Sequence, residues 1–477
     1  MHFLRYVRRR DSVSSRGRGG VGLTGWRALI AGAALLVAAP NPRHAAFAPP
    51  TARRVRTQVA DYRIGYLPAP ERATEYAWTA HHYDRIVLDW GDAVSMPQYR
   101  RLNTGAQIER YALSWTVIQP TSPTAANIAA TYYPDLVSWY ASHPQHQLER
   151  AFLHRAGCSG GAGCRVSFHL WKDDRWALNP GDAGLRAYQV SRLMRVAADA
   201  DGLFLDEHGS GDFEPLFKAQ SMEYPSRVVY ERDIVTMLRD IRAALAPRKH
   251  VIINTATYVT EWDAEMVRAA GGSNGEHFND AIFPEMERRW AFAEANLAAG
   301  ASMAIGHAAD PAAGFGAGNY ASPLERQRMW ELASYYLIAP VNPGALYLNP
   351  NGSAWSRPFA TTWFGALDVD IGAARPRERG GAGPSRRVQA AGVDGAGQQY
   401  RVWSRDYSNA LVLVRPLIAW PGKRTGDETA VSVALPQGAQ YRLLRGAGQA
   451  GPALSSILLR GAEAAILMKI SDPVGRR

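Results

Sequence analysis

Short apolar runs alternate with amphipathic stretches between residues 81 and 373. Runs such as Ile86–Leu88 and Gly202–Leu205 contain no polar side chain, which is typical of strands that are buried on both faces. In the stretches between the runs, apolar residues recur at helical spacing, as they do over residues 182–200. Strands that alternate with helices along a chain predict a parallel sheet.

Eight such strand-like runs occur in this part of the chain. In order they are Ile86–Leu88, Ile108–Leu113, Leu148–Leu153, Gly202–Asp206, Val251–Ile253, Gly271–Asp280, Ser302–Ile305 and Ala345–Leu348. Eight strands that alternate with helices favour an α/β fold of the closed (β/α)8 TIM barrel type over residues 81–373. An open doubly wound sheet is the alternative, but no glycine-rich phosphate loop follows the first run.

The pattern changes on both sides of this predicted barrel. Residues 49–80 are rich in proline and irregular, and residues 374–387 are rich in glycine and arginine, so we predict a linker in each place. Residues 388–477 contain short strand-like runs that are separated by turns and lack helical spacing. We therefore expect a small antiparallel, β-sandwich-like domain at the end of the chain.

The first 48 residues have the pattern of a targeting segment. They hold eight arginines and one acid, Asp11, followed by the apolar stretch Ala28–Ala39. That stretch is too short to span a bilayer, which needs about 20 residues, and it fits the apolar part of a signal peptide. We expect export to the periplasm or the extracellular space. Because Pro40 and Pro49 follow the small residues where cleavage is expected, an uncleaved anchor in the inner membrane is the alternative.

Composition and charge narrow the class of protein. The hydrophobic content of 47% is ordinary for a globular chain. The formal net charge is +11, but most of it lies in residues 1–48, and the rest of the chain has no basic run with interleaved aromatic residues. We therefore predict no nucleic-acid partner, and we expect membrane contact through the N-terminal segment alone.

Two cysteines, Cys158 and Cys164, flank the sequence SGGAG. In an exported protein this spacing predicts a short loop closed by a disulfide, and two free thiols are the alternative. A metal site would need two further soft ligands nearby, and the sequence offers none. We predict neither a metal nor a cofactor. The sequence also offers no GxSxG elbow at a turn from a predicted strand to a helix and no His/Asp metal spacing, which disfavours serine hydrolases and metallohydrolases.

Carboxylic acids follow several of the predicted strands. Asp89, Asp206 and Glu276 come at strand ends, and Glu207 lies beside the second of them. Ionisable groups at strand ends are common in barrel active sites, although such an acid can also cap the next helix or turn. Cleavage of a glycosidic bond needs two carboxyl groups across the sugar, and the ends of the fourth and sixth strands supply them.

Other polar and aromatic residues near strand ends are candidates for substrate binding. We favour Asp206 as the group that faces the substrate because it directly follows Leu205. Glu207 is expected to bind a sugar hydroxyl or to pair with an arginine. Aromatic faces stack on sugar rings, although tryptophans are also common in packing, and the histidines fit surface or internally bonded positions equally well. The candidates for binding are Asp89, Trp90, Trp171, Trp176, Glu207, His208, Asn254, His277 and His307.

Five segments occur in an order that resembles a known family. They are YDRIVLDWG, WALNPGD, ADGLFLDEHG, NGEHF and WFGALDVDIGAARP, and they lie between Tyr83 and Pro376. This order resembles the hypothetical glycosyl hydrolase family 15 of bacterial enzymes, in the α-galactosidase superfamily of (β/α)8 barrels. The resemblance implies a nucleophilic aspartate after the fourth strand and an acid/base after the sixth, which fall on Asp206 and Glu276. Two acids of the last segment, Asp368 and Asp370, are expected to be structural.

The sequence therefore leads to two hypotheses. The first is an exported glycoside hydrolase that cleaves an oligo- or polysaccharide with retention of configuration, with Asp206 as nucleophile and Glu276 as acid/base. The second is a catalytically inert barrel that binds polysaccharide at the cell envelope. Carboxyl groups about 5–10 Å apart favour the enzyme, whereas an acid buried in an ion pair favours the binding protein. The sugar, the linkage and the oligomeric state stay open.

Overall fold

In the computed structural model, the described part of the chain consists of residues 57–63, 73–88, 96–102, 105–122, 132–170, 173–213, 216, 221–255, 259–278, 286–306, 316–340, 345–350, 363–375, 386–416 and 429–470. The predicted signal segment, residues 1–48, lies outside these ranges. None of the helices in the ranges is long and apolar enough to cross a membrane.

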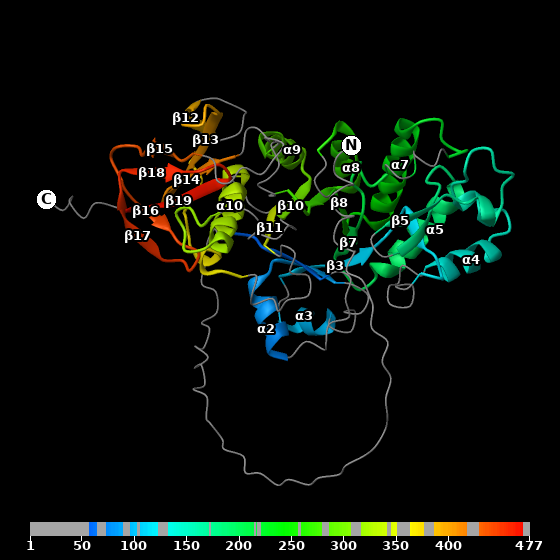
Figure 1. Ribbon diagram of the computed structural model, residues 1–477. Coiled ribbons are helices and arrows are strands. Elements are labelled where there is room, and N and C mark those ends of the chain that lie inside the picture. Colours follow the sequence, from blue (N-terminus) through cyan, green and yellow to red (C-terminus); the bar gives the residue numbers. More distant parts are fainter. Residues whose placement is uncertain are drawn as a thin grey trace, which may run out of the picture. The chain divides into compact units, whose positions relative to one another are not determined.

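A parallel sheet forms the centre of the fold (Figure 1). Its strands pair in their order along the chain: β1 (Ala60–Arg63), β2 (Arg85–Leu88), β3 (Gln107–Ala112), β7 (Gly202–Leu205), β8 (His250–Asn254), β9 (Gly272–Gly275), β10 (Ser302–Gly306) and β11 (Leu346–Asn349). The ring closes because Val59 bridges Leu348 in parallel and the Leu348 N–H donates to the Gln58 carbonyl at 2.8 Å. The predicted (β/α)8 barrel is confirmed.

Helices lie in the connections between these strands, as the periodicity predicts. They are α2 (Ala73–His82), α3 (Met96–Leu102), α5 (Ala183–Val196), α7 (Arg227–Leu245), α8 (Glu261–Ala270), α9 (Met286–Ala298) and α10 (Pro323–Ile338). Helix α5 begins after Asp182, whose side chain accepts a hydrogen bond from the Leu185 N–H at 2.8 Å. Its buried face includes Tyr188 and Leu193, two of the residues that define its apolar periodicity.

Two predicted assignments at the start of the barrel are wrong, and they compensate for each other. Strand β1 and most of helix α2 lie within residues 49–80, which we predicted as a linker. The sequence of β1 is ADYR, which contains two charged residues and is therefore not an unbroken apolar run. The predicted third strand, Leu148–Leu153, is instead a 3-10 helix over Leu148–Ala151, followed by an isolated bridge at Phe152. Gly202–Leu205 is therefore still the fourth strand of the barrel.

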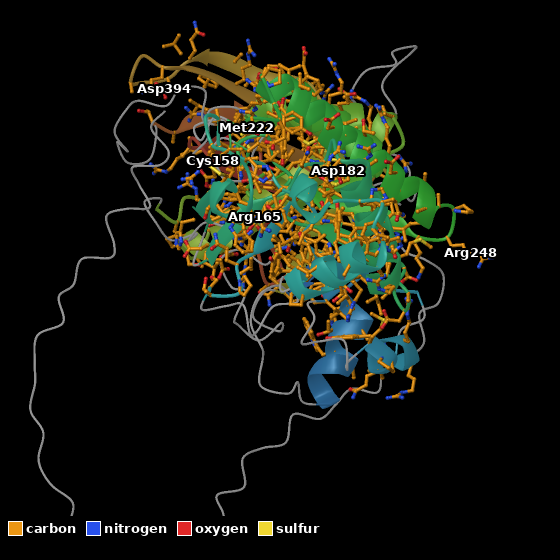
Figure 2. The ribbon with its side chains drawn as sticks, turned by 90° about the vertical axis from the view of Figure 1, so that its right-hand side faces the viewer. Cys158, Arg165, Asp182, Met222, Arg248 and Asp394 are labelled. Carbon is orange, nitrogen blue, oxygen red and sulfur yellow. A yellow bond between two sulfur atoms is a disulfide. The ribbon has the colours of Figure 1, made fainter. Side chains whose placement is uncertain are left out.

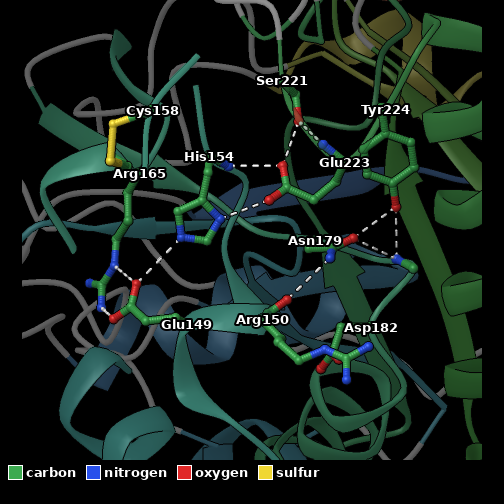
Figure 3. Close-up of polar contacts among 12 residues, drawn as sticks. Glu149, Arg150, His154, Cys158, Arg165, Asn179, Asp182, Ser221, Glu223 and Tyr224 are labelled. Carbon is green, nitrogen blue, oxygen red and sulfur yellow. Dashed lines mark hydrogen bonds and ion pairs between the residues drawn. A yellow bond between two sulfur atoms is a disulfide. The ribbon is translucent and has the colours of Figure 1, made fainter. Parts of the chain in front are cut away.

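A long excursion separates β3 from β7. It contains β4 (Thr116–Ile118), α4 (Tyr133–Ser142), β5 (Ser167–Leu170) and β6 (Asp173–Ala177), and its strands form an antiparallel sheet in the order β4-β6-β5. Cys158 and Cys164 form the predicted disulfide, with a Cα–Cα distance of 5.7 Å. Cys158 and Arg165 of this excursion are labelled in Figure 2. In Figure 3 the disulfide lies beside the ion pair between Arg165 and Glu149.

An antiparallel β-domain follows the barrel, as predicted. Its six-stranded sheet has the order β12 (Arg387–Val393), β13 (Gln399–Asp406), β14 (Ala410–Arg415), β19 (Glu463–Ile470), β16 (Gln440–Leu444) and β17 (Ala450–Leu454). Strands β15 (Val431–Ala434) and β18 (Ser456–Leu459) pair beside it. Ala374 bridges Tyr407, so the first residue of the predicted linker 374–387 already contacts this domain. The other domain limits stay predictions.

The β-domain is joined to α10 by buried polar contacts. The Arg326 guanidinium donates to the Gly461 carbonyl at 2.7 Å and to the Gly316 carbonyl at 2.9 Å. The fully buried carboxylate of Glu463 accepts from the Asn319 N–H at 2.7 Å. Apolar side chains of α10 and of β14 belong to one buried cluster, Leu332 and Leu413 among them. The connection that leads into α10 is therefore held from the β-domain.

A buried polar network lies at the N-terminal ends of the barrel strands. The Arg85 Nε lies 3.0 Å from the Glu109 Oε1, and the His250 Nε2 lies 2.6 Å from the same oxygen. Arg85 also donates to the Gln107 side chain at 3.0 Å and to the Ser302 hydroxyl at 2.9 Å. We call Arg85, Glu109 and His250 the N-terminal network. Above it the barrel is filled by an apolar cluster that includes Val87, Phe204, Ile252 and Ala304.

Candidate active site

Three polar side chains follow neighbouring strands at the opposite edge of the barrel. Asp206 comes directly after β7, Asn254 is the last residue of β8, and Glu276 comes directly after β9. These are the fourth, fifth and sixth strands of the ring. Because the strands are parallel, their carboxyl ends meet at one edge. The two acids singled out in the sequence therefore lie on the same face of the barrel.

The amide group of Asn254 connects the two acids. Its Nδ2 donates to the Asp206 Oδ1 at 2.8 Å and to the Glu276 Oε2 at 2.9 Å. An amide nitrogen carries two hydrogens, one for each acceptor. The two carboxylate oxygens are separated by less than these two distances taken together, which is below the roughly 6.5–9.5 Å that inverting glycosidases use. The geometry fits the shorter spacing of about 5–5.5 Å in retaining enzymes.

Asp206 is surrounded by hydrogen-bond donors. Asp206 is 9% exposed. In addition to the Asn254 amide, the Glu207 N–H donates to its Oδ1 at 2.8 Å and the Tyr111 hydroxyl donates to its Oδ2 at 3.0 Å. Three donors on two oxygens match an ionised carboxylate, which only accepts hydrogen bonds. This is the form that a nucleophile requires.

Glu276 has a more open environment than Asp206. Glu276 is half-buried and lies in the turn that follows Gly275. The Asn254 amide donates to one of its oxygens. The pair is therefore asymmetric, with one carboxyl group enclosed by donors and the other reachable from solvent. Two carboxyl groups in different environments are what separate acid and nucleophile roles in a glycosidase.

Glu207 occupies an unusual position beside this pair. Its φ is +62°, in the left-handed region that residues with a Cβ rarely adopt. The side chain is buried and forms an ion pair with Arg175 of β6. Burial raises the pKa of the Glu207 carboxyl to about 7, against the opposing effect of the Arg175 guanidinium. Of the two roles considered for Glu207, the pairing with an arginine is the one the structure contains.

His208, one of the predicted binding residues, is enclosed by the protein. His208 is 0% exposed. Its Nδ1 donates to the Asp206 carbonyl at 2.8 Å, and its Nε2 accepts from the Ser114 hydroxyl at 2.8 Å. Burial lowers the pKa of His208 to about 4, so the ring is neutral at physiological pH. The prediction that His208 binds substrate does not fit this burial, because the side chain after a strand end can turn inward as well as outward.

The role of the other predicted binding residues remains a prediction. His277 is half-buried next to Glu276, and its carbonyl accepts from Arg289 at 2.6 Å. Trp176 lies on β6 within an aromatic group, with ring centroids 5.1 Å from Tyr133 and 5.9 Å from Phe152. This fits the packing role that the sequence left open for tryptophans. The remaining predicted residues, Asp89, Trp90, Trp171 and His307, lie outside the described residues.

Three residues of the site were missed by sequence reasoning. Tyr111 lies in a predicted strand, and its place near the carboxyl end was a signal that could have found it. Arg175 comes from the excursion, where nothing local indicated that it reaches Glu207. Asp212 accepts from the Gly209 N–H at 2.8 Å. Its pKa is raised well above its usual range by burial and by the nearby Glu207, Asp206 and Glu276.

The site is thus built from acids, an amide, a phenol and one guanidinium. Within the described residues, no group of three or more His, Cys, Asp or Glu side chains is arranged to hold a metal ion. Such a set of groups can donate a proton, accept one, and offer a carboxylate to an electrophilic carbon.

Comparisons with known proteins give distant structural likenesses. The sequence matches no protein-family model and no curated protein. A GH27 β-L-arabinopyranosidase from Geobacillus stearothermophilus has a TM-score of 0.46 at 10% identity, with 88% of this chain and 98% of that chain covered. An α-amylase from Lactobacillus plantarum has a TM-score of 0.44 at 11% identity, with 87% and 99% covered. An α-galactosidase from Thermus thermophilus has a TM-score of 0.38 at 14% identity, with 70% and 65% covered. These TM-scores are low, so the fold rests on the strand pairing of the chain itself.

Proposed function

We propose that this chain is a glycoside hydrolase that cleaves an oligo- or polysaccharide with retention of configuration. The observation that carries the proposal is the Asn254 amide, which holds the Asp206 and Glu276 carboxyl groups at a spacing that fits a retaining enzyme. Both acids follow parallel strands at the edge of the barrel where such enzymes place their chemistry. The sequence resemblance to the hypothetical glycosyl hydrolase family 15 implies catalytic roles for the same two residues.

In the first step, a carboxylate oxygen of Asp206 forms a bond to the anomeric carbon. The glycosidic bond breaks as Glu276 transfers its proton to the leaving oxygen. Asp206 is suited to this role because its hydrogen-bond donors match the ionised form. Glu276 is suited to proton transfer because its half-buried side chain can exchange protons with solvent.

In the second step, Glu276 is a carboxylate and takes a proton from a water molecule. The water oxygen forms a bond to the anomeric carbon, and the ester bond to Asp206 breaks. Both residues return to their starting forms. Two displacements at one carbon retain its configuration. Throughout, the Asn254 amide can donate to whichever of the two carboxyl groups carries negative charge.

A hydrolysis screen tests this function directly. The full chain is incubated with a panel of polysaccharides, and the release of reducing ends is measured, with the anomer of the first product identified by proton NMR. We expect hydrolysis of at least one substrate, a product that retains its configuration, and loss of activity in Asp206→Asn and Glu276→Gln. Glu265→Gln is the matched control, because Glu265 pairs with Arg239 on the exposed surface.

The outcomes of the screen separate the two hypotheses for this barrel. An inverted product would rule out Asp206 as nucleophile. Retarded migration in a gel containing polysaccharide, without the release of reducing ends, would favour the inert binding protein instead. Unchanged hydrolysis in Asp206→Asn would reject the assignment of the site.

We also propose that the protein is exported. The disulfide between Cys158 and Cys164 fits an oxidising compartment, and the apolar stretch after the arginines fits a signal segment. Cell fractionation of the full chain tests this. We expect the protein in the periplasm, the medium or the inner membrane fraction, and a purely cytoplasmic protein would contradict the proposal.

A further inference from the structure

The turn after β7 keeps a side chain at a position where glycine is easier. Glu207 has a φ of +62°, and for a residue with a Cβ the left-handed conformation costs on the order of 1 kcal/mol. The chain has glycine close by, at Gly209 and Gly211, but not at this position. Backbone strain of this kind often accompanies functional sites. The side chain of Glu207 is therefore the feature to explain.

The backbone of Glu207 is fixed on both sides. Its N–H donates to the Asp206 Oδ1 at 2.8 Å. The next N–H, that of His208, donates to the Asn254 carbonyl at 2.8 Å. The Glu207 carbonyl accepts from the Trp115 indole. In this structure it is the left-handed φ that lets the chain meet the carboxylate of Asp206 and the end of β8 with successive N–H groups.

The side chain of Glu207 is held by Arg175. The two residues are 32 positions apart, and their ion pair joins the β7 turn to strand β6 of the excursion. Arg175 is 4% exposed. Its other terminal nitrogen lies 3.8 Å from the Asp173 carboxylate, which in turn accepts from the Ser122 hydroxyl at 2.7 Å. The guanidinium is thus anchored within the excursion and reaches the site through Glu207.

We propose that Arg175 is a positioning residue of the active site, which holds the Glu207 carboxylate so that the Glu207 N–H stays on the Asp206 Oδ1. The inference rests on the proposed function, because it gives Arg175 a part in preparing the nucleophile. Arg175 acts through the conformation of residue 207. The excursion between β3 and β7 then contributes to the site by supporting the strained turn from outside the barrel.

The alternative role for Arg175 is a direct electrostatic effect on the acids. The two roles respond differently to a second substitution. Glycine adopts positive φ without steric cost, so Glu207→Gly preserves the turn when Arg175 no longer holds it. A direct charge effect depends on the net charge at positions 175 and 207, which Glu207→Gln and Glu207→Gly change equally, whereas only Glu207→Gly eases the left-handed turn. We call Arg175→Met with Glu207→Gly the double variant, and its comparison with Arg175→Met plus Glu207→Gln distinguishes the roles.

The first experiment measures the conformation of the turn. Crystal structures of the full chain are determined for Arg175→Met and for the double variant. We expect residue 207 to leave the left-handed region in Arg175→Met, with the bond from its N–H to Asp206 lost, and both features to return in the double variant. A Glu207 that keeps its φ and its bond in Arg175→Met overturns the inference. Glu207→Gly alone is not used, because it leaves a buried guanidinium unpaired.

The second experiment measures kinetics on a polysaccharide that the wild-type protein hydrolyses. We expect Arg175→Met to lower kcat about 10–100-fold with KM nearly unchanged, since one hydrogen bond to a charged group is lost. Arg175→Lys keeps the charge but has a different donor geometry. Its kcat should lie between the kcat of the wild type and that of Arg175→Met. The double variant should recover most of the kcat lost in Arg175→Met. Equal kcat values in the double variant and in Arg175→Met plus Glu207→Gln would contradict the positioning role.

Arg165→Met is the matched control. Arg165 is also a buried arginine of the excursion, and its ion-pair partner is Glu149 (Figure 3). We expect it to lower stability but leave kcat unchanged, and an equal loss of kcat would make the effect of Arg175 a general one. Should Asp206→Asn prove as active as wild type, the proposed function fails, while the crystal structures still decide whether Arg175 positions the turn.

Discussion

Carboxyl groups at the two ends of the barrel have different kinds of partner, a cation at one end and a neutral amide at the other. In the N-terminal network, Glu109 is 0% exposed and faces the Arg85 guanidinium and the His250 ring. At the other end, Asp206 and Glu276 share the neutral amide of Asn254. A cation compensates the charge of the first acid, whereas an uncharged donor brings two acids together without neutralising them. The first arrangement suits structural closure of the barrel, and the second suits proton transfer.

The largest effect is expected from the nucleophile. Asp206→Asn should lower kcat by on the order of 10³–10⁴-fold, as the loss of a covalent catalytic group does in other enzymes, while the free energy of unfolding changes little. Initial rates and urea unfolding measure the two quantities separately. A variant that is inactive because it is unfolded would leave the contrast between the two ends of the barrel without support.

Breaking the N-terminal network should give the reverse pattern. Arg85→Met leaves the buried carboxylate of Glu109 without its guanidinium, which is expected to lower the free energy of unfolding by about 3–5 kcal/mol. The kcat of the folded protein should stay within about twofold, because the site at the other edge keeps its contacts. A large fall in kcat with intact folding would show that the two ends are coupled.

The shared amide is expected to have an intermediate effect. Asn254→Leu removes the donor to both acids, and each hydrogen bond to a charged group is worth about 1.5–3 kcal/mol. We expect kcat to fall about 10–100-fold and the pH dependence of kcat to shift, because each carboxyl group loses a hydrogen bond to its charged form. Asn254→Asp places a third acid there and should be worse than Asn254→Leu. Equal pH profiles in the wild type and Asn254→Leu would contradict the proposed role.

The smallest effect is expected from a change at His208, and it concerns the pH dependence of stability. Its pKa is lowered from 6.5 to about 4 in the folded protein by burial, so the unfolded chain binds a proton more readily. The contribution of His208 to stability is present above pH 6.5 and is lost as the pH falls towards 4. His208→Asn should flatten this part of the curve of unfolding free energy against pH. A curve that keeps its slope would show that other groups cause it.

The parts of the fold that could be predicted from the sequence are those marked by a pattern within one short segment. Gly202–Leu205 is apolar on both faces and ends in an acid, so both the strand and its candidate residue could be read from the pattern. Strand β1 could not, because its sequence ADYR alternates charge with small and aromatic side chains. The count nevertheless placed Asp206 after the fourth strand, since the false strand at 148–153 made up for the missing β1.

The parts of the site that sequence missed depend on contacts between distant segments. Arg175 reaches Glu207 because Val117 of β4 pairs with Trp176 of β6 and so orients β6, and no periodicity in either segment predicts that pairing. His208 was misassigned for a related reason. Its position after a strand end is visible in the sequence, but its inward direction is set by Ser114 and the Asp206 carbonyl.

The contacts between α10 and the β-domain bear on how the chain can be divided. Arg326 and Asn319 belong to the barrel connection, but the Gly461 carbonyl and the Glu463 carboxylate that they contact belong to the turn after β18 and to the first residue of β19. Ending the chain near residue 374 would remove these acceptors and leave a buried guanidinium without them. We therefore expect the two domains to melt in a single cooperative transition, and we expect the barrel to be a poor candidate for isolation or grafting as an independent module.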